Sequence, residues 1–355
     1  MIDRAGIQAE EVNVCILCGH GGCWLHRGLE DLIFGIQGRW DFMRCPKCGL
    51  VWLTPRPTPE HVARLYDRYY THDMPSPSRR APSLIARCRR RAGENVLFAR
   101  FGYAFPGRGW IDQIMGWMLS WIPTFRERMG RRIIWLNGQK NGRLLDVGCG
   151  NGEFLAYMRS LGWDVFGVEP DEAAVRAARD RFDLVIYHGT LETVQLPEAF
   201  FDSVIMNHAI EHVPDPIETM RKCHALLKPE GRIHLLTPNT DSLGHRLFGI
   251  SWRGLEPPRH YHLFTADTLK RCLRLAGLTI DSVRSIAGGA KIFWRESRYL
   301  ERISRGKEGS DKVPTLRQRL EDSFWQSLER LLSVFHPVGE EIVLTAHKKS
   351  LTEKR

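Results

Sequence analysis

Glycines and one acidic residue are spaced as in a nucleotide-binding turn. An apolar strand with Leu144, Leu145 and Val147 leads into Gly148, Gly150 and Gly152, and a second strand ends on Glu169. Glycines leave such a turn open to a ligand, and the N-terminus of the following helix favours a carboxylate or phosphate. Glu169 lies 19 residues past Gly150, where an acidic side chain can accept hydrogen bonds from both hydroxyls of a ribose.

The glycine spacing distinguishes two classes of cofactor. It is G-x-G-x-G, and Glu153 stands where a dinucleotide-binding fingerprint requires its third glycine, so no pyrophosphate cradle is predicted. The pattern favours S-adenosylmethionine over NAD. Asp146, which ends the first strand, is expected to serve the amino group of the cofactor, directly or through water. The alternative is that it only braces the glycine turn.

Four cysteines form two C-x-x-C pairs that predict a metal site. They are Cys15, Cys18, Cys45 and Cys48. Two thiolates three residues apart can bind one ion from a single turn, and the glycine after each pair lets the chain reverse. Four sulfurs close a tetrahedral zinc site, which leaves no open position and is therefore structural. The competing ligands between the pairs are His20, Cys23 and His26, and two turns without metal are the alternative.

Beyond the glycine turn, the chain resembles the class I S-adenosylmethionine-dependent methyltransferases. The resemblance rests on FDSVIMNHAIEHVPDP at 201–216 and on the Lys-Pro-Glu-Gly turn within 219–239. The segment 250–278 and the end GEEIVLTAHKK are similar to a subgroup that includes ubiquinone-pathway O-methyltransferases and many sugar and polysaccharide methyltransferases, some of which begin with a zinc ribbon. The resemblance covers about 143–286 and 339–349, and it implies a Rossmann-like seven-stranded sheet whose last strand is antiparallel.

Candidate catalytic residues follow the strands of this expected sheet. Methyl transfer requires an aligned nucleophile and, for a hydroxyl, removal of a proton. His208 directly follows the fourth strand, and an unperturbed pKa of about 6.5 suits a general base near neutral pH. Glu211 orients a histidine, or else Glu211 and His212 hold the loop. His260 is the alternative base; otherwise His260 and His262 order their own loop through backbone hydrogen bonds.

The remaining contacts are expected from the family pattern. Thr190 and Leu191 follow a glycine where many relatives have Gly-Asp, so their backbone groups are expected to contact the adenine. Asn207, at the exit of the fourth strand, completes the predicted cofactor contacts. Trp252 is expected to supply a flat surface for a ring-shaped substrate. The chain lacks the carboxylate cluster that magnesium prefers, so no catalytic metal is predicted.

The elements that position these residues alternate between β and α, which is typical of a mostly parallel sheet with helices on both faces. Strands are expected at 143–147, 164–169, 184–187, 202–206, 231–237, 278–286 and 340–347, and helices at 152–162, 171–182, 216–228 and 266–276. Three regions are predicted: a zinc ribbon at 1–58, a basic Trp-rich helical linker or cap at 59–142, and the methyltransferase domain at 143–349 with a helical insertion at 287–338. The proline-rich stretch at 74–83 is expected to be a loop.

The positive charge of the chain is located in one region. The net charge is +10, and the segment 74–143 carries fourteen basic and three acidic residues. Within it, 110–125 predicts a helix with an apolar face of Trp110, Ile114, Trp117, Met118, Trp121 and Phe125. This face lies in a membrane interface beside anionic lipid, or it covers the substrate side of the catalytic domain. Basic residues at 110–132 and a second amphipathic helix at 314–336 make a membrane surface one expected partner.

Composition limits the function classes. The 355 residues, 43% of them hydrophobic, can bury a full core, and neither a signal peptide nor an apolar run of about 18 residues is present. We expect a cytoplasmic enzyme, free or peripheral on the inner face of a membrane, that methylates a small-molecule, saccharide or lipid-linked hydroxyl. Carbon and nitrogen acceptors stay open. An RNA methyltransferase that uses the ribbon and the basic segment is the alternative, although the aromatic residues lie in an apolar helix rather than on a base-stacking sheet.

Overall fold

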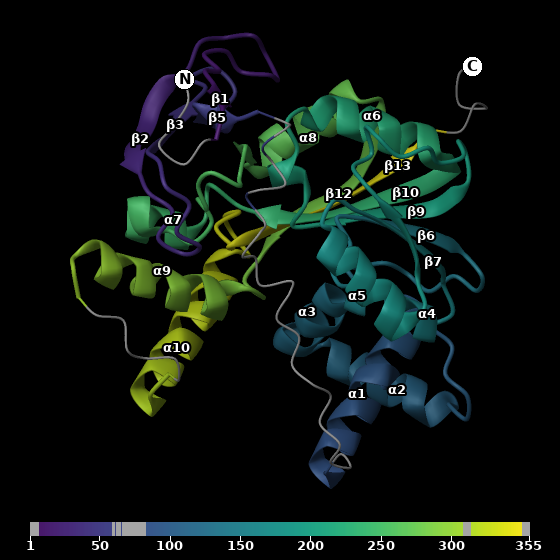
Figure 1. The fold of residues 1–355 in the computed structure, drawn as a ribbon. Helices are drawn as coiled ribbons and strands as arrows, with labels where there is room; N and C mark the ends of the chain where they lie inside the picture. The colour runs from purple at the N-terminus through teal and green to yellow at the C-terminus, as the bar shows by residue number, and fades with distance from the viewer. Residues whose placement is uncertain (1–6, 59–60, 62–64, 66–82, 308–313, 350–355) are drawn as a thin grey trace. The chain divides into compact units, whose positions relative to one another are not determined.

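The computed structural model describes residues 7–58, 61, 65, 83–307 and 314–349 (Figure 1). Most of the predicted loop at 74–83 lies outside these residues. The chain divides into two compact units. Unit 1 consists of residues 1–69, 196–199 and 206–355, and unit 2 of residues 70–195 and 200–205.

The first half of the main sheet is parallel and carries the glycine turn. Strand β6 (Arg143–Val147) pairs with β7 (Asp164–Glu169) on one side and with β9 (Phe201–Asn207) on the other, and β7 pairs with β8 (Val185–His188). Helices α4 (Glu153–Ser160) and α5 (Glu172–Phe182) follow β6 and β7. Leu144, Leu145 and Val147 are buried because a parallel strand that is covered on both faces is rich in apolar residues.

The second half of the sheet is antiparallel. Strand β13 (Glu341–Lys348) lies between β10 (Leu227–Pro238) and β12 (Leu278–Ile286), with α6 (Pro216–Leu226) and α8 (Ala266–Leu275) preceding β10 and β12. The order β12-β13-β10-β9-β6-β7-β8 is that of the class I methyltransferase sheet, and it confirms the predicted seven strands and the antiparallel last strand. Strand β10 begins four residues before its predicted start, because the chain is already extended at Leu227.

The N-terminal region forms small antiparallel sheets. Strands β2 (Cys23–Leu29), β3 (Trp40–Arg44) and β4 (Val51–Thr54) form a sheet completed by β11 (His262–Leu263), and β1 (Ala9–Glu10) pairs with β5 (Arg56–Pro57). The pairing of His262 with Trp52 joins segments that are far apart in the sequence. The N-terminal strands and the segment around His262 contribute to one core, which includes Trp40, Phe42 and Leu53 together with Trp252 and Leu263. The described part of the predicted ribbon, residues 7–58, therefore packs within unit 1.

Further helices are described in both units. In unit 2, α1 (Leu84–Phe101) contacts α2 (Trp110–Ser120) and α3 (Pro123–Arg132). The single helix predicted at 110–125 is wrong, because Pro123 starts a new helix after a break at Trp121 and Ile122. In unit 1, α7 (Leu243–Phe248) precedes the insertion at 287–338, which contains α9 (Ala290–Ser304) and α10 (Leu316–Leu332), joined by stacked Trp294 and Trp325.

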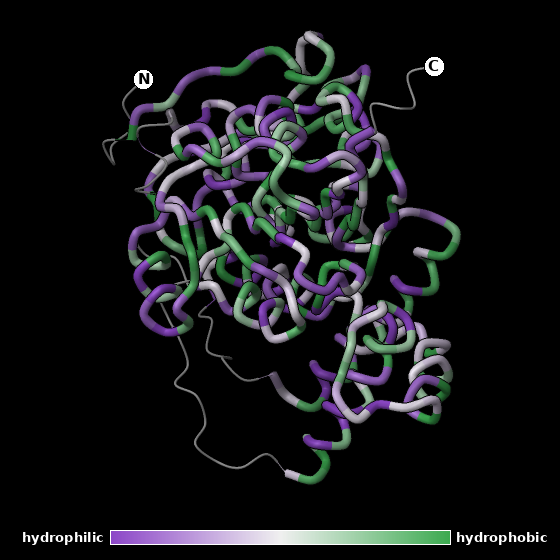
Figure 2. The backbone as a smooth tube through the Cα atoms, turned by 90° about the vertical axis from the view of Figure 1, so that its right-hand side faces the viewer, coloured by the Kyte–Doolittle hydropathy of each residue, from purple (hydrophilic) through white to green (hydrophobic). Residues whose placement is uncertain are grey.

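Hydrophobic stretches in these helices are short. In Figure 2, green segments along the described backbone alternate with purple ones. Among the helices of the described residues, none combines the length and the hydropathy needed to cross a bilayer.

Candidate functional site

The glycine turn has a backbone conformation that side chains disfavour. Gly148, Gly150 and Gly152 have φ angles of 79°, 54° and 76°. A Cβ atom at Gly152 would lie 2.6 Å from the Cδ1 atom of Leu184. The Gly148 N–H donates to the carbonyl of Val168 at 2.8 Å, which ties the turn to β7. The turn is therefore held open next to the end of β7.

Two buried carboxylates lie beside this turn. Glu169 is 8% exposed and accepts hydrogen bonds from the N–H groups of Gly150 at 2.8 Å and Asp171 at 3.0 Å. Asp146 is 2% exposed, and its Oδ1 atom has no hydrogen-bond partner. Burial, with a contribution from the charge of Glu169, raises the pKa of Asp146 to about 8. Such a pair suits a ligand that brings an ammonium group and hydroxyl donors, as S-adenosylmethionine does.

The loop after β8 satisfies its own backbone groups. The N–H of Thr190 donates to the Thr193 hydroxyl at 2.9 Å, and the Thr190 carbonyl accepts from the N–H groups of Thr193 and Val194. The expected contact between the Thr190 backbone and adenine would have to replace one of these bonds. The Leu191 side chain is buried. Asn207, at the end of β9, has a buried Oδ1 atom without a hydrogen-bond partner, which leaves it able to meet a ligand.

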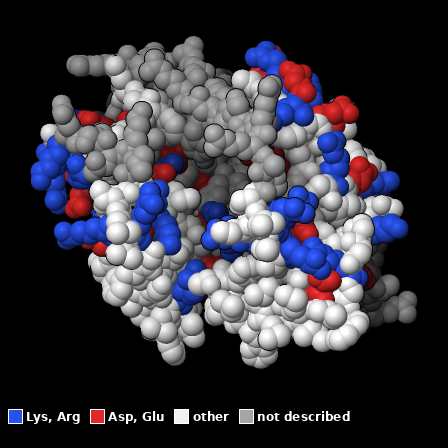
Figure 3. All heavy atoms as spheres, turned by 90° about the horizontal axis from the view of Figure 1, so that it is seen from below, with Lys and Arg blue, Asp and Glu red and all other residues white. Residues whose placement is uncertain are grey.

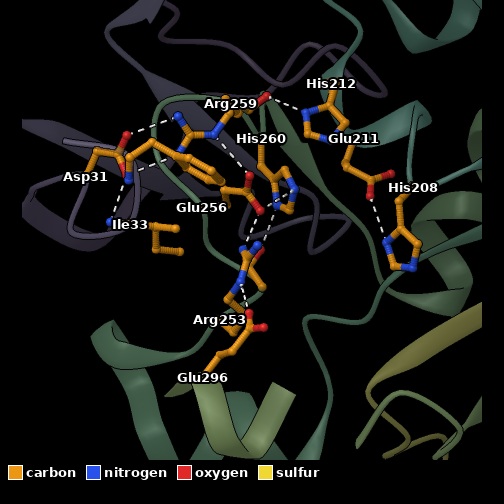
Figure 4. A network of polar contacts seen from close by, with 12 residues as sticks. Asp31, Ile33, His208, Glu211, His212, Arg253, Glu256, Arg259, His260 and Glu296 are labelled. Atoms are coloured by element: carbon orange, nitrogen blue, oxygen red, sulfur yellow. Dashed lines mark hydrogen bonds and ion pairs between the residues drawn. The ribbon is translucent and has the colours of Figure 1, made fainter. Parts of the chain in front are cut away.

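His208 lies between two carboxylates. Its Nε2 atom is 2.8 Å from Oε1 of Glu341 and its Nδ1 atom is 3.3 Å from Oε1 of Glu211, while its own side chain is 31% exposed (Figure 4 shows the Glu211 contact). Burial alone would lower the pKa of His208, but the bonds to Glu211 and Glu341 outweigh it and raise the pKa to about 9. The ordinary pKa assumed from the sequence is therefore wrong. The imidazole is cationic at neutral pH.

Glu341 is a site residue that the sequence did not single out. It begins β13, 133 positions after His208, and its side chain is fully buried. The sequence did contain a signal for this contact. Glu340 and Glu341 stand together at the start of a strand, and a carboxylate that is buried there is expected to have a partner. Glu211 is also buried, and its Oε2 atom accepts a hydrogen bond from the Thr237 hydroxyl at 2.9 Å.

The other candidates from the second histidine cluster are buried. The Nδ1 atoms of His260 and His262 donate to the carbonyls of Gly254 and Val213. Burial, together with nearby His212, lowers the pKa of His260 to about 4. These bonds agree with the alternative in which the two histidines order their loop.

Trp252 does not offer a surface for a ring-shaped substrate. Its side chain is buried and donates from Nε1 to Oε2 of Glu340 at 2.8 Å, and the ring stacks on His245. The sequence-based expectation for Trp252 is therefore wrong, because the ring lies in the core that Trp252 and Leu263 share with the N-terminal strands.

A buried ionic network lies next to this loop (Figure 4). Arg259 donates to both carboxylate oxygens of Asp31 at 3.0 Å and to Oε1 of Glu256 at 3.0 Å. Arg253 connects the second oxygen of Glu256 to Glu296. The network joins the N-terminal region, the loop after β10 and helix α9. His212, whose Nδ1 donates to the carbonyl of Arg259, connects it to the Glu211 loop.

The four predicted zinc ligands come together. Sγ distances are 3.5 Å for Cys15 and Cys48, 3.4 Å for Cys18 and Cys45, and 3.8 Å for Cys18 and Cys48. A tetrahedral ion with Zn–S bonds of about 2.3 Å places its sulfurs roughly 3.8 Å apart. Gly19 and Gly49 have φ angles of 70° and 84°, as the predicted chain reversals require. The cysteine set thus fits zinc.

A further group of possible metal ligands consists of Glu211, His212 and His260, whose ligand atoms lie within 4.8 Å of one another.

Unit 2 has a hollow of about 660 Å³ at the amino ends of β6, β7 and β8, lined by Arg143, Asp164 and Val185 among others. It lies at the opposite ends of these strands from the glycine turn. We therefore do not assign the cofactor to it.

Comparison with known proteins gives the following similarities. Residues 122–283 match a family model described as a methyltransferase domain. A ubiquinone biosynthesis O-methyltransferase of Dinoroseobacter shibae is 31% identical over 160 residues, which are 42% of this chain and 64% of the relative. A protein of the same name from Acinetobacter baumannii is 29% identical over 189 residues, 50% of this chain and 76% of the relative.

The chain spans less than two thirds of several of these relatives, including 55% of the enzyme of the same name from Pseudomonas aeruginosa. Among solved structures, an S-adenosylmethionine-dependent methyltransferase from Mesorhizobium loti has 18% identity and a TM-score of 0.43, covering 64% of this chain and 97% of that chain. One from Archaeoglobus fulgidus has 23% identity and a TM-score of 0.41, covering 64% and 94%. The strand order β12-β13-β10-β9-β6-β7-β8 identifies the fold.

Proposed function

The chain carries a class I S-adenosylmethionine-dependent methyltransferase domain, and from this premise we propose that it methylates a hydroxyl of a small-molecule, saccharide or lipid-linked acceptor. The cofactor supplies a methyl group on a sulfonium, which an oxygen nucleophile can attack. The observation that carries the proposal is the open glycine turn beside Asp146 and Glu169. The buried oxygens of these two side chains suit the amino group and the ribose hydroxyls of S-adenosylmethionine. An oxygen acceptor is favoured because relatives at about one third identity are named O-methyltransferases.

In this proposal His208 is the base. Of the three catalytic candidates from the sequence, Glu211 and His260 are buried, whereas the His208 side chain reaches the surface. Its φ angle of 51° is unusual for a residue other than glycine, and such strain concentrates at functional sites. Neutral His208 accepts the hydroxyl proton at Nδ1, which has the longer of the two carboxylate contacts. Glu211 and Glu341 then stabilise the imidazolium and act as positioning residues.

The pH dependence of methyl transfer tests both the activity and the base. We expect labelled methyl groups from S-adenosylmethionine to appear on a hydroxylated acceptor, at a rate that rises with pH toward about 9, because only neutral His208 accepts a proton. Glu341→Gln removes a carboxylate that stabilises the cation, so the pKa of His208 falls. A fall of one unit would raise the neutral fraction at pH 7 from about 1% to about 10% and move the rising limb to lower pH. Product analysis with labelled cofactor and acceptor libraries gives both the rate and the acceptor.

Asp281→Asn is a matched control. It removes the carboxylate 2.6 Å from His347, also on the β12–β13 pair, without touching His208. Its profile should equal that of the unmodified protein. A methyl-transfer rate that stays constant or falls between pH 7 and 10 would eliminate His208 as the base. The same conclusion would follow if the rising part of the pH–rate profile of Glu341→Gln did not move to lower pH. Absence of labelled product from every hydroxyl acceptor, with product on RNA, would replace the proposed function by the RNA alternative.

We propose further that Cys15, Cys18, Cys45 and Cys48 hold one structural zinc ion. The sulfur separations and the paired glycine turns support this assignment. A closed set of four thiolates stabilises the surrounding fold and leaves no position for substrate.

Zinc content is measured directly. Protein purified without chelators should contain about one equivalent of zinc by elemental analysis, and Cys45→Ser should lose it together with local order around the N-terminal strands. Cys23→Ser, which changes an exposed cysteine between the pairs, is the control and should keep the metal. Finding iron, or no metal, in the unmodified protein would overturn the zinc assignment.

A further inference from the structure

Helix α2 buries the side that a surface helix usually exposes. Its buried residues are Asp112, Gly116 and Ser120. A Cβ atom at Gly116 would lie 2.0 Å from the carbonyl oxygen of Asn95, so the small side of α2 packs directly on α1. A helix at a protein surface normally turns its apolar stripe inward. Here the apolar stripe is left outside.

The outward side of α2 is a continuous apolar surface, here called the α2 face. Its side chains are 43% to 81% exposed: Trp110, Ile111, Ile114, Met115, Trp117, Met118, Trp121 and Ile122. From Trp110 to Phe125 the sequence contains one charged residue, Asp112, and that residue is buried. Exposed apolar patches of this kind mark interaction sites.

Charges around the α2 face are separated by sign. Glu94 and Asp112 are turned inward, where both pair with Arg108. Arg90 and Arg91 also pair with Glu94 and Asp112. The other exposed arginines on α1 and α3 include Arg89, Arg100, Arg126, Arg128 and Arg132. The view in Figure 3 shows blue side chains bordering uncharged surface. The surface formed by α1, α2 and α3 is therefore both apolar and cationic.

We propose that the α2 face docks on a lipid bilayer that contains anionic headgroups. A bilayer surface matches both properties, since tryptophan and aliphatic side chains enter the boundary of the acyl chains while arginines contact the phosphates. A second copy of the chain would bring two cationic rims together. A polynucleotide would pair with the arginines and leave the tryptophans in water. This proposal concerns a binding surface and does not depend on the methyl transfer reaction.

Vesicle binding by the 355-residue protein, purified without chelators, tests the proposal. We expect co-sedimentation with vesicles of phosphatidylcholine mixed with phosphatidylglycerol, and binding at least tenfold weaker to phosphatidylcholine alone. Trp117→Ala/Trp121→Ala should weaken binding by about tenfold or more, because aromatic insertion is lost. Arg126→Gln/Arg128→Gln should have an effect of similar size and reduce the sensitivity to salt. These side chains are exposed, so circular dichroism should show that both variants keep their helix content.

Matched controls use exposed residues of the same types in unit 1. Trp24→Ala and Arg221→Gln should bind anionic vesicles like the unmodified protein. Absence of binding to anionic vesicles would overturn the proposal, as would binding that the tryptophan variant leaves unchanged. A tryptophan-dependent dimer in sedimentation analysis, or RNA that binds through the same arginines and displaces the vesicles, would assign the α2 face to another occupant.

Discussion

Arg259→Met is expected to lower the free energy of unfolding by about 3–5 kcal/mol, which is the usual result of breaking a buried ion pair by removing one partner. The Arg259 side chain has no exposed area, and it makes two hydrogen bonds to Asp31 and one to Glu256. Methionine fills a similar volume but leaves the Asp31 carboxylate buried without its cation. Urea denaturation followed by tryptophan fluorescence gives the value.

Two further variants show whether this loss comes from the buried charge. Arg39→Met removes an arginine whose side chain is 80% exposed and whose Nε atom lies 3.6 Å from Oε1 of exposed Glu30, and it should change stability by less than about 0.5 kcal/mol. Adding Asp31→Asn to Arg259→Met should recover part of the loss, since the unpaired charge is removed. If Arg259→Met costs less than about 1 kcal/mol, the network does not hold the N-terminal region in place.

Glu169→Ala is expected to weaken the binding of S-adenosylmethionine and of its demethylated product by about 100-fold or more. A charge-assisted hydrogen bond contributes roughly 1.5–3 kcal/mol, and a ribose offers two hydroxyls to this carboxylate. The variant also removes the acceptor that holds the Gly150 N–H at 2.8 Å, which loosens the turn. Isothermal titration calorimetry with both ligands measures the loss.

Glu172→Gln is the comparison for Glu169. It lies three residues later, at the start of α5, and its side chain is 64% exposed, so binding should stay within about twofold of the unmodified protein. Equal affinity of Glu169→Ala and the unmodified protein would remove Glu169 from the cofactor site. Tighter binding of NADH than of S-adenosylmethionine would reverse the choice of cofactor.

The parallel half of the fold could be read from the sequence because its signals are local. Gly148, Gly150 and Gly152 adopt the positive φ angles that the turn requires, and the parallel strands β6 and β7 begin and end where periodicity places them. The four cysteines were equally clear, since each pair makes its own turn. In each case one segment determines its own conformation, so no knowledge of distant contacts was needed.

The site around His208 could not be read in the same way. His208 and Glu341 are 133 positions apart, and only strand pairing brings them together. The charge state of the imidazole depends on that contact, so an estimate from His208 alone was wrong. The burial of Trp252 depends likewise on Glu340 and on the N-terminal strands. Side chains whose roles depend on long-range partners stay beyond local pattern analysis.

The strand β11 has a consequence for synthesis of the chain. Residues 51–54 form the β4 edge, and their partner His262 leaves the ribosome about 200 residues later. At roughly 5–20 residues per second, the nascent sheet exposes an unpaired edge for about 10–40 s. Arg259, the cation for buried Asp31, arrives at the same late stage. During this interval the proposed zinc ion would be the main constraint on residues 7–58, so zinc supply during translation is expected to affect the yield of folded protein.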